Sequence, residues 1–418
     1  MNPIVRFAIG DVRSDHSITK DLPDPPFGCE VVDENDSIIG WLAIDSLVRG
    51  RSHGGVRLSP GVSLEELCAL AHRMTLKFGF LGLAGGGAKA GVLGDPEALS
   101  TEKMLRLRQF VKAISPLIKE GYYHPAPDLG TSDAEIDNMI AVLGIKRHRA
   151  EPTREMSGFY TSLSVVAGVQ AAVQHLGLNL VGLDVAVEGF GKVGAAVVSA
   201  LAKAGAKIVA VSTSFGALYD PKGLNVNELM SARTAGNRFI TSYRGAARLK
   251  PEELLTLPVE VLCPCAASWS INPANALGVQ AHIVCPGANL PFAPGAEAIL
   301  VRRGVLCLPD FVSNCGGVLG GTMEFAGVDR NTIQRFVAEK MSLWFAAWLA
   351  NDKRTERLPS EFAEQKAMER FAKSKRRSES TSAFNYLFNT GLEAYRWGLI
   401  PTALVGRVSL SYFERILI

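Results

Sequence analysis

Residues 183–310 alternate between short apolar segments and helix-forming segments. Five apolar segments have the composition of strands: LDVAVE (183–188), KIVAVS (207–212), VEVLCP (259–264), HIVCPG (282–287) and GVLCLPD (304–310). The segment AAVVSALAKAG (195–205) between the first two is typical of a helix that Gly205 ends. Because apolar strands separated by helices form parallel sheets covered on both faces, this pattern predicts a doubly wound α/β domain.

A glycine motif joins the first of these strands to its helix. Gly189, Gly191 and Gly194 follow the G-x-G-x-x-G spacing. In this context the glycines allow a tight turn and a close backbone approach to a pyrophosphate, which the helix N-terminus then holds. We therefore predict a Rossmann-type dinucleotide site here that includes Lys192 and Val193. The alternative is a glycine-rich turn without a ligand.

The second strand of such a domain ends at the residues that contact the adenosine ribose. Here Ser212 and Thr213 occupy those positions, and neither is acidic. An acidic residue would bind the free 2′-hydroxyl of NAD and repel the 2′-phosphate of NADP. We therefore expect NAD or NADP as cofactor, with Lys222 or Arg244 as candidate cations for a 2′-phosphate.

The rest of the chain predicts a mixed α/β domain before the dinucleotide domain and helices after it. Residues 29–46 have the pattern of a β-hairpin, and residues 63–80 and 101–121 have helical spacing. We expect a substrate-binding and assembly domain at 1–155, a dinucleotide domain at 156–335 and a helical segment at 336–418. Within the last segment, a polar stretch near 351–382 has the composition of a mobile region.

Charge and composition narrow the possible partners. The chain has 44 Lys and Arg against 41 Asp and Glu, a net charge of +3, which does not favour nucleic acid as a partner. No apolar run reaches the length of a membrane span, and seven scattered cysteines do not have the spacing of a metal site. We expect a cytoplasmic protein with reduced thiols and no metal.

Several ordered motifs resemble one known family. They are SHGGVRLSP (52–60), MTLKFGF (74–80), GGGAKAG (85–91), HPAPDLGT (124–131), VAVEGFGKVG (185–194), CPGANLPFAP (285–294) and LPDFVSNCGGV (308–318). Together they resemble the Glu/Leu/Phe/Val dehydrogenases over roughly residues 28–330. The resemblance implies reversible NAD(P)-dependent oxidative deamination of an L-amino acid to a 2-oxo acid and ammonia. It also implies a homo-oligomer.

The resemblance also implies roles for individual residues. Lys89 would be the catalytic lysine, and Asp128 would be the second catalytic group, which relays protons to the amine. Lys77, with the backbone of Gly54 and Gly55, would hold the substrate carboxylate. By the same resemblance, Asn314 would contact the substrate, and Thr161 and Asn289 would contact the nicotinamide.

The surroundings of Lys89 agree with a catalytic role. The lysine lies among glycines, alanines and aliphatic residues, so burial should lower the pKa of its ammonium, and a nearby cation should lower it further. A lysine near neutrality can take a proton from the water that attacks an imine. The alternatives are a surface lysine at this position and a simple turn residue at Asp128.

Two departures from the family pattern affect the predicted substrate. In the glutamate branch a lysine and a serine hold the side-chain carboxylate, and here those positions are His53 and Gly321. We therefore predict a neutral aliphatic or aromatic substrate side chain, unless a protonated His53 or Arg57 restores the charge. A glutamate dehydrogenase is the alternative. Ser162 and Ser164 replace two frequent glycines and leave open a catalytically impaired nucleotide-binding relative.

Overall fold

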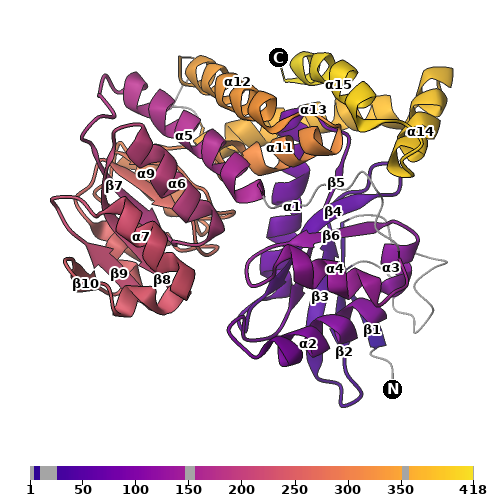
Figure 1. Ribbon diagram of the computed structural model, residues 1–418, viewed down its shortest axis with the longest axis horizontal. Coiled ribbons are helices and arrows are strands. Elements are labelled where there is room, and N and C mark those ends of the chain that lie inside the picture. The colour runs from indigo at the N-terminus through magenta and orange to yellow at the C-terminus, as the bar shows by residue number, and fades with distance from the viewer. Residues whose placement is uncertain (1–3, 10–25, 146–155, 351–356, 418) are drawn as a thin grey trace. The chain divides into compact units, whose positions relative to one another are not determined.

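The computed structural model describes residues 4–9, 26–145, 156–350 and 357–417. The chain divides into two compact units, shown in Figure 1, which are described separately below. Unit 1 comprises Met1–Arg154 and Lys366–Leu404, and unit 2 comprises Glu155–Gln365 and Val405–Ile418. This division differs from the predicted linear one, because residues 336–418 are shared between the two units. The predicted boundary at 155 adjoins residues 146–155, which lie outside the described residues.

Unit 1 contains a six-stranded mixed sheet in the order β1-β2-β3-β5-β4-β6. The pairs β1–β2, β2–β3 and β3–β5 are antiparallel, whereas β4 runs parallel to both β5 and β6. The β2–β3 pair confirms the hairpin predicted at 29–46. The strands are β1 (Ile4–Ile9), β2 (Phe27–Val32), β3 (Ile38–Ile44), β4 (Ser52–Leu58), β5 (Gly86–Val92) and β6 (Tyr123–Pro127).

Helices cover the two faces of this sheet differently. On one face, α2 (Ser100–Ala113), α3 (Ser115–Lys119) and α4 (Asp133–Ala141) form an apolar core with Ala88, Ala90 and Val92 of β5. On the other face, Leu67 and Ala71 of α1 (Leu64–Leu81) pack with Ala43 of β3. Since side chains alternate along a strand, Lys89 belongs to the face that α1 covers.

Local sequence signals set the ends of the unit 1 helices. Ser63 caps α1 by accepting a hydrogen bond from the backbone N–H of Glu66, and Gly82 ends the helix with a φ of 67°. The single helix predicted at 101–121 is instead two helices separated at Ile114. Pro116 explains the interruption, because proline is tolerated in the first turn of a helix but not in its interior.

Unit 2 contains a seven-stranded sheet in the order β10-β9-β8-β7-β11-β12-β13. Its parallel strands match the five predicted segments: β7 (Asp184–Glu188), β8 (Lys207–Thr213), β11 (Val261–Pro264), β12 (Ile283–Val284) and β13 (Leu306–Cys307). Two antiparallel strands, β9 (Gly216–Tyr219) and β10 (Ala247–Leu249), extend the edge beyond β8. They were not predicted, because three or four residues carry almost no periodic signal.

Helices lie on both faces of the unit 2 sheet, as a doubly wound fold requires. The predicted helix at 195–205 is α6 (Lys192–Lys203), which starts inside the glycine motif. The other helical elements are α5 (Ser157–His175), α7 (Val226–Ala232), η1 (Arg233–Ala235), η2 (Asn237–Thr241), η3 (Pro251–Thr256), α8 (Pro273–Ala276), α9 (Ala296–Arg302), α10 (Asp310–Ser313), α11 (Gly316–Phe325) and α12 (Arg330–Ala350). The predicted fold class is confirmed.

The C-terminal region is more ordered than its composition indicated. The polar stretch near 351–382 contains a 21-residue helix, α13 (Pro359–Glu379), which its composition did not predict. Ala367 and Phe371 of α13 pack against Gly79 of α1, where a Cβ would lie 2.2 Å from the Ala367 carbonyl oxygen. Two further helices follow, α14 (Ala383–Arg396) and α15 (Thr402–Ile416). No helix among the described residues is long and apolar enough to cross a membrane.

The close packing of α1 on β5 predicts that Gly87→Ala destabilises the protein. A Cβ at Gly87 would lie 2.4 Å from the Ala71 carbonyl oxygen and from Thr75, so α1 must move to accommodate it. We expect a loss of about 1–3 kcal/mol in the free energy of unfolding, measured by urea denaturation. Gly61→Ala is the matched control, because a Cβ there meets no described atom within 4 Å. Equal stability of the two variants would contradict this packing.

Candidate active site

The parallel strands of unit 1 bring Arg57 and the two predicted catalytic residues, Lys89 and Asp128, to one face of the sheet. Arg57 of β4 pairs in register with Gly91 of β5, so Lys89, two residues earlier, lies diagonally beside it on the same face. Asp128 directly follows β6, whose Pro127 pairs with Val56. The alternation of side chains therefore directs Arg57, Lys89 and Asp128 toward α1.

These residues form a buried charge cluster, which also includes Glu66 of α1. The Lys89 Nζ lies 2.9 Å from Asp128 Oδ1, and the Arg57 Nε donates to Asp128 Oδ2 at 3.0 Å. The Arg57 guanidinium also donates to Glu66. The exposed fraction of the side chain is 3% for Lys89, 6% for Arg57, 13% for Glu66 and 17% for Asp128. The structure thus confirms that Lys89 is not a surface lysine.

Burial and the neighbouring charges shift the pKa values of this cluster in definite directions. Burial lowers the pKa of Lys89, and Arg57 lowers it further, although Asp128 acts in the opposite direction. Burial alone would raise the pKa of Asp128, but Lys89 and Arg57 together hold it well below the usual range. Asp128 is therefore ionised at neutral pH, and Lys89 gives up its proton more readily than an ordinary lysine.

Arg57 and Glu66 are the residues of this cluster that sequence reasoning missed. Arg57 was considered only as a cation for the substrate side chain. The alternation of side chains along β4 could have identified Arg57, because Arg57 lies on the same face of β4 as His53 and Gly55. Glu66 carried no comparable signal, because it lies in α1 and its partner Arg57 lies in a strand, β4.

The glycines predicted beside the carboxylate have steric reasons to be glycines. A Cβ at Gly55 would lie 2.7 Å from the Cβ of Asp128, and one at Gly54 would lie 1.6 Å from the Ala88 carbonyl oxygen. Lys77 is buried in α1. Its role toward a substrate carboxylate, and that of the two glycines, remains a prediction.

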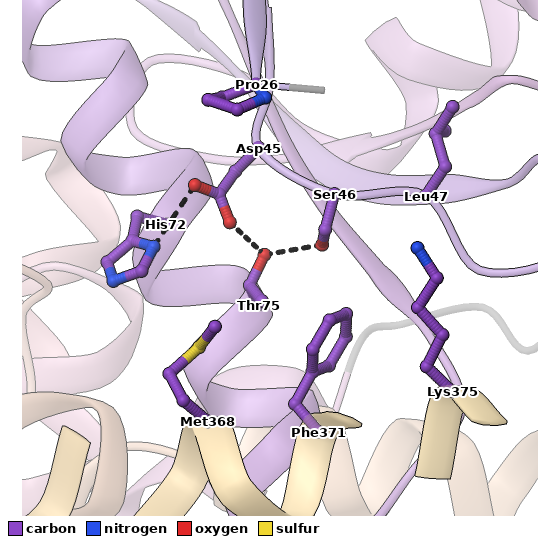
Figure 2. Close-up of a pocket in the computed structure, with 9 residues that line it drawn as sticks. All are labelled: Pro26, Asp45, Ser46, Leu47, His72, Thr75, Met368, Phe371 and Lys375. Carbon is purple, nitrogen blue, oxygen red and sulfur yellow. Dashed lines mark hydrogen bonds and ion pairs between the residues drawn. The ribbon is translucent and has the colours of Figure 1, made fainter. Parts of the chain in front are cut away.

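A chain of hydrogen bonds fixes α1 onto β5, and Figure 2 shows its part from His72 through Asp45 and Thr75 to Ser46. The Gly87 N–H donates to the Ser46 hydroxyl at 2.9 Å, and the Ser46 and Thr75 hydroxyl oxygens are 2.7 Å apart. Thr75 donates to Asp45, whose other oxygen lies 3.1 Å from His72 Nδ1. These groups line a cavity of about 300 Å³ in unit 1 that Met368, Phe371 and Lys375 also border. The chain holds together the two elements that carry Lys77 and Lys89.

The glycine loop in unit 2 fits a dinucleotide position by position. Gly189 has a φ of 84°, which favours glycine, and a Cβ at Gly194 would lie 1.8 Å from the Gly189 carbonyl oxygen. By contrast, a Cβ at Gly191, which precedes α6, would meet no described atom within 4 Å. The first and third glycines thus serve the fold, and the second leaves the space that a pyrophosphate needs.

The hydroxyls of Ser212 and Thr213 are directed into the protein. The Ser212 hydroxyl accepts from the Gly189 N–H at 3.0 Å, and the Thr213 hydroxyl donates to the Asn237 carbonyl oxygen at 3.1 Å. Both residues support the glycine loop and its surroundings. Contact of either with a ribose remains a prediction.

Asn314 and Asn289 lie together in unit 2. The Asn314 amide nitrogen donates to Asn289 Oδ1 at 3.0 Å and to the Ala288 carbonyl oxygen at 2.9 Å. The amide oxygen of Asn314 is buried and has no hydrogen-bond partner within the described residues. A buried acceptor of this kind is costly unless a donor reaches it, so it fits the amine of a substrate or the amide of a nicotinamide.

The two serines near the predicted nicotinamide position are buried inside the protein. Ser162 donates to the Phe159 carbonyl oxygen, and Ser164 accepts from the Gly316 N–H at 3.0 Å. The Thr161 hydroxyl lies beside Gly317, where a Cβ would be 2.5 Å away from it. Ser164 therefore supports the contact between α5 and α11, whereas the hydrogen bond of Ser162 stays within α5.

Comparison with known proteins agrees with this geometry. A model of the Glutamate/Leucine/Phenylalanine/Valine dehydrogenase family matches residues 156–378, and a model of the Glu/Leu/Phe/Val dehydrogenase dimerisation domain matches residues 27–143. The chain belongs to the Glu/Leu/Phe/Val dehydrogenase family. It is therefore an NAD(P)-dependent amino-acid dehydrogenase.

Individual members of the family give the degree of similarity. Glutamate dehydrogenase of Thermotoga maritima is 37% identical over 303 residues, which cover 68% of this chain and 72% of that protein. NAD-specific glutamate dehydrogenase of Staphylococcus aureus is 32% identical over 303 residues, with the same coverage. The crystal structure of hetero-hexameric glutamate dehydrogenase from Thermus thermophilus, in a leucine-bound form, has a TM-score of 0.69 at 28% identity. That match covers 84% of this chain and 89% of that chain.

Lys89→Ala should abolish most turnover in this dehydrogenase. Removal of general acid–base assistance alone lowers the rate by about 10²–10⁴-fold. NADH or NADPH binding, measured by fluorescence titration, should be unchanged, because the glycine loop belongs to unit 2. Lys112→Ala, at an exposed lysine, is the control. A Lys89→Ala enzyme with most of its activity would remove this lysine from the mechanism.

Arg57→Met should move the acidic limb of the kcat/KM pH profile to higher pH. Arg57 lowers the pKa of Lys89, and its removal also leaves Asp128 and Glu66 as anions that raise this pKa. The acidic limb reports the pKa of the free enzyme's base, so a higher pH is needed to deprotonate Lys89. Arg57→Lys keeps a cation and should give an intermediate profile. An unchanged limb in Arg57→Met would mean that a group other than Lys89 titrates there.

Proposed function

We propose that this chain catalyses the reversible oxidative deamination of an L-amino acid with a neutral side chain, aliphatic or aromatic. The observation that carries the reaction is the buried Lys89–Asp128 pair, with 2.9 Å between Nζ and Oδ1. The observation that carries the substrate class is the commitment of Arg57 to Asp128 and Glu66.

The residues of unit 1 serve the proton transfers. Lys77 binds the substrate carboxylate. After the amine has become an imine, the neutral amine of Lys89 takes a proton from water as the oxygen attacks Cα. Asp128, which has taken a proton from the substrate ammonium before hydride transfer, returns this proton to the nitrogen. It then accepts the hydroxyl proton as the C–N bond breaks, so that ammonia and a 2-oxo acid leave. The low pKa of Asp128 suits this relay, because its ionised form accepts the proton it later donates.

The residues of unit 2 serve the cofactor. The glycine loop at Gly189–Gly194 would hold the pyrophosphate, and Thr161, Asn289 and Asn314 would hold the nicotinamide end and the amine. When bound, NAD or NADP supplies the oxidant, since its nicotinamide ring takes up the hydride from Cα. The buried amide oxygen of Asn314 would orient whichever donor it meets.

A neutral side chain agrees with the charges near His53. A γ-carboxylate needs a cation, and the family's lysine and serine are here His53 and Gly321. Arg57 cannot replace that lysine without leaving its two carboxylates, which would leave uncompensated buried charges. The His53 ring stacks on His124 with 4.8 Å between centroids and lies 5.9 Å from the ring of Phe78, an aromatic setting.

The adjacent glycines Gly320 and Gly321 have different surroundings. The space at Gly320 is filled, since a Cβ there would lie 2.3 Å from the ring of Tyr160. Gly320 therefore offers no additional space beside a substrate. A Cβ at Gly321 meets no described atom within 4 Å, so that position is open.

Glutamate is the second candidate substrate, and the names of the relatives favour it. The Thermotoga maritima and Staphylococcus aureus proteins are both glutamate dehydrogenases. If this chain also uses glutamate, a protonated His53 would have to hold the γ-carboxylate. Assembly into a homo-oligomer is also proposed, on the basis of the match to a dimerisation domain and of the hexameric Thermus thermophilus relative.

Side-by-side kcat/KM values for leucine, phenylalanine, tryptophan and glutamate test the substrate class. A neutral amino acid should be preferred, because an incompletely paired buried carboxylate costs several kcal/mol. The double variant His53→Lys, Gly321→Ser should shift the preference toward glutamate. Glutamate as the best substrate of the unmodified enzyme would contradict the neutral pocket but not the reaction. No turnover of any amino acid would contradict the reaction itself.

A further inference from the structure

Two arginines lie at the carboxyl end of β8 without an acidic partner. The strand ends at Thr213, and the residues Ser214 and Phe215 turn the chain into β9. Arg233 of η1 and Arg238 of η2 both contact this neighbourhood. Neither guanidinium forms an ion pair with any residue that the structure describes. An arginine pair without anions at a nucleotide-binding edge has charge available for a ligand.

Arg238 is held beside the β8–β9 turn by two contacts. Its guanidinium carbon lies 4.2 Å from the centroid of the Phe215 ring, within the range of a cation–π contact. The preceding residue, Asn237, accepts the hydrogen bond from the Thr213 hydroxyl. The arginine is exposed at this site, so its N–H groups remain accessible.

Arg233 is held on the glycine loop. Its Nε donates to the Phe190 carbonyl oxygen at 3.2 Å, and the Phe190 N–H donates to the Ser212 carbonyl oxygen at 2.6 Å. The Phe190 ring also packs against Phe239 of η2, with 5.8 Å between centroids. Phe190 therefore links the glycine loop, the end of β8 and the segment that carries both arginines.

The acidic residues nearest in sequence are engaged elsewhere. Asp220 accepts from the Lys222 N–H, and Glu228 accepts from Asn225 and Tyr243. The end of β8 itself carries Ser212, Thr213 and Ser214, none of them charged. This edge of the dinucleotide site is consequently cationic.

We propose that Arg233 and Arg238 bind the 2′-phosphate of NADP and that this enzyme prefers NADP to NAD. The ribose of a dinucleotide on the glycine loop reaches the end of the second strand, β8, and both arginines contact residues beside this end. A 2′-phosphate is close to a dianion at neutral pH, and guanidinium groups bind phosphate through paired N–H donors. The 2′-hydroxyl of NAD offers no such charge. This inference rests on the dinucleotide site of the proposed function.

The rival positions Lys222 and Arg244 are less well placed. Among the described residues, neither side chain forms a hydrogen bond or a cation–π contact with Thr213, Phe215 or Phe190. A different role for Arg238, stacking on the adenine ring, would strengthen NAD and NADP equally. The experiment must therefore separate recognition of the phosphate from recognition of adenosine.

Calorimetry can measure the binding of adenosine 2′,5′-bisphosphate and of adenosine 5′-monophosphate. Comparing the two affinities separates recognition of the 2′-phosphate from recognition of adenosine and does not depend on turnover. The unmodified protein should bind the bisphosphate more tightly. Arg233→Met and Arg238→Met should each weaken bisphosphate binding by about tenfold or more, with monophosphate binding unchanged. Arg244→Met tests the rival position, and Arg302→Met, at an exposed arginine of α9, is the neutral control. If a methionine variant fails to fold, Arg→Lys at the same position should retain part of the preference.

Three binding outcomes would overturn the proposal. Equal binding of the two nucleotides by the unmodified protein would show that no 2′-phosphate site exists. Equal loss of both nucleotides in Arg238→Met would assign that arginine to adenosine, and selective loss in Arg244→Met alone would move the site. The ratio of kcat/KM values for NADP and NAD should favour NADP. Absence of turnover with both coenzymes would contradict the proposed function while leaving the binding result intact.

Discussion

The pairing of Asp128 with both Lys89 and Arg57 is the interaction on which the organisation of unit 1 depends. It joins β4, β5 and the residue that directly follows β6. Arg57 extends it to Glu66 in the first turn of α1. With Lys89 protonated, two cations balance two anions away from water. Removal of one partner from a buried pair costs about 3–5 kcal/mol, so these elements hold one another in place. The same balance makes release of the Lys89 proton possible.

Small residues make this arrangement sterically possible. Gly55 leaves room for the Asp128 side chain, and Gly87 lets α1 approach β5 closely enough for the Thr75–Ser46–Gly87 hydrogen bonds. In unit 2, Gly194 likewise allows α6 to pack against the strand end at Gly189. In both units a close backbone approach positions the groups that chemistry requires. Packing thus explains the glycine-rich sequence around Lys89.

The sequence predicted what depends on local pattern. The parallel strands, the hairpin and the roles of Gly189 and Gly194 all follow from residues close together in the chain. It did not predict Arg57 and Glu66, because an ion pair between strands and helix depends on register. It did not predict the helix α13, because a polar composition does not reveal that Ala367 and Phe371 lie on one buried face of the helix. It also did not predict that Tyr160 of α5 fills the space beside Gly320 of α11, because these two residues are far apart in the chain.

The protonation of Lys89 is the most direct test of this account. Its amine can be followed by NMR in protein labelled at lysine Cε and Nζ, with the signal assigned by its loss in Lys89→Arg. We predict that Lys89 titrates below the value of an ordinary lysine, about 10.4, and that Asp128→Asn lowers its pKa further by removing the anion that opposes burial. A Lys89 pKa at or above the ordinary value, unaffected by Asp128→Asn, would contradict the central role of this cluster.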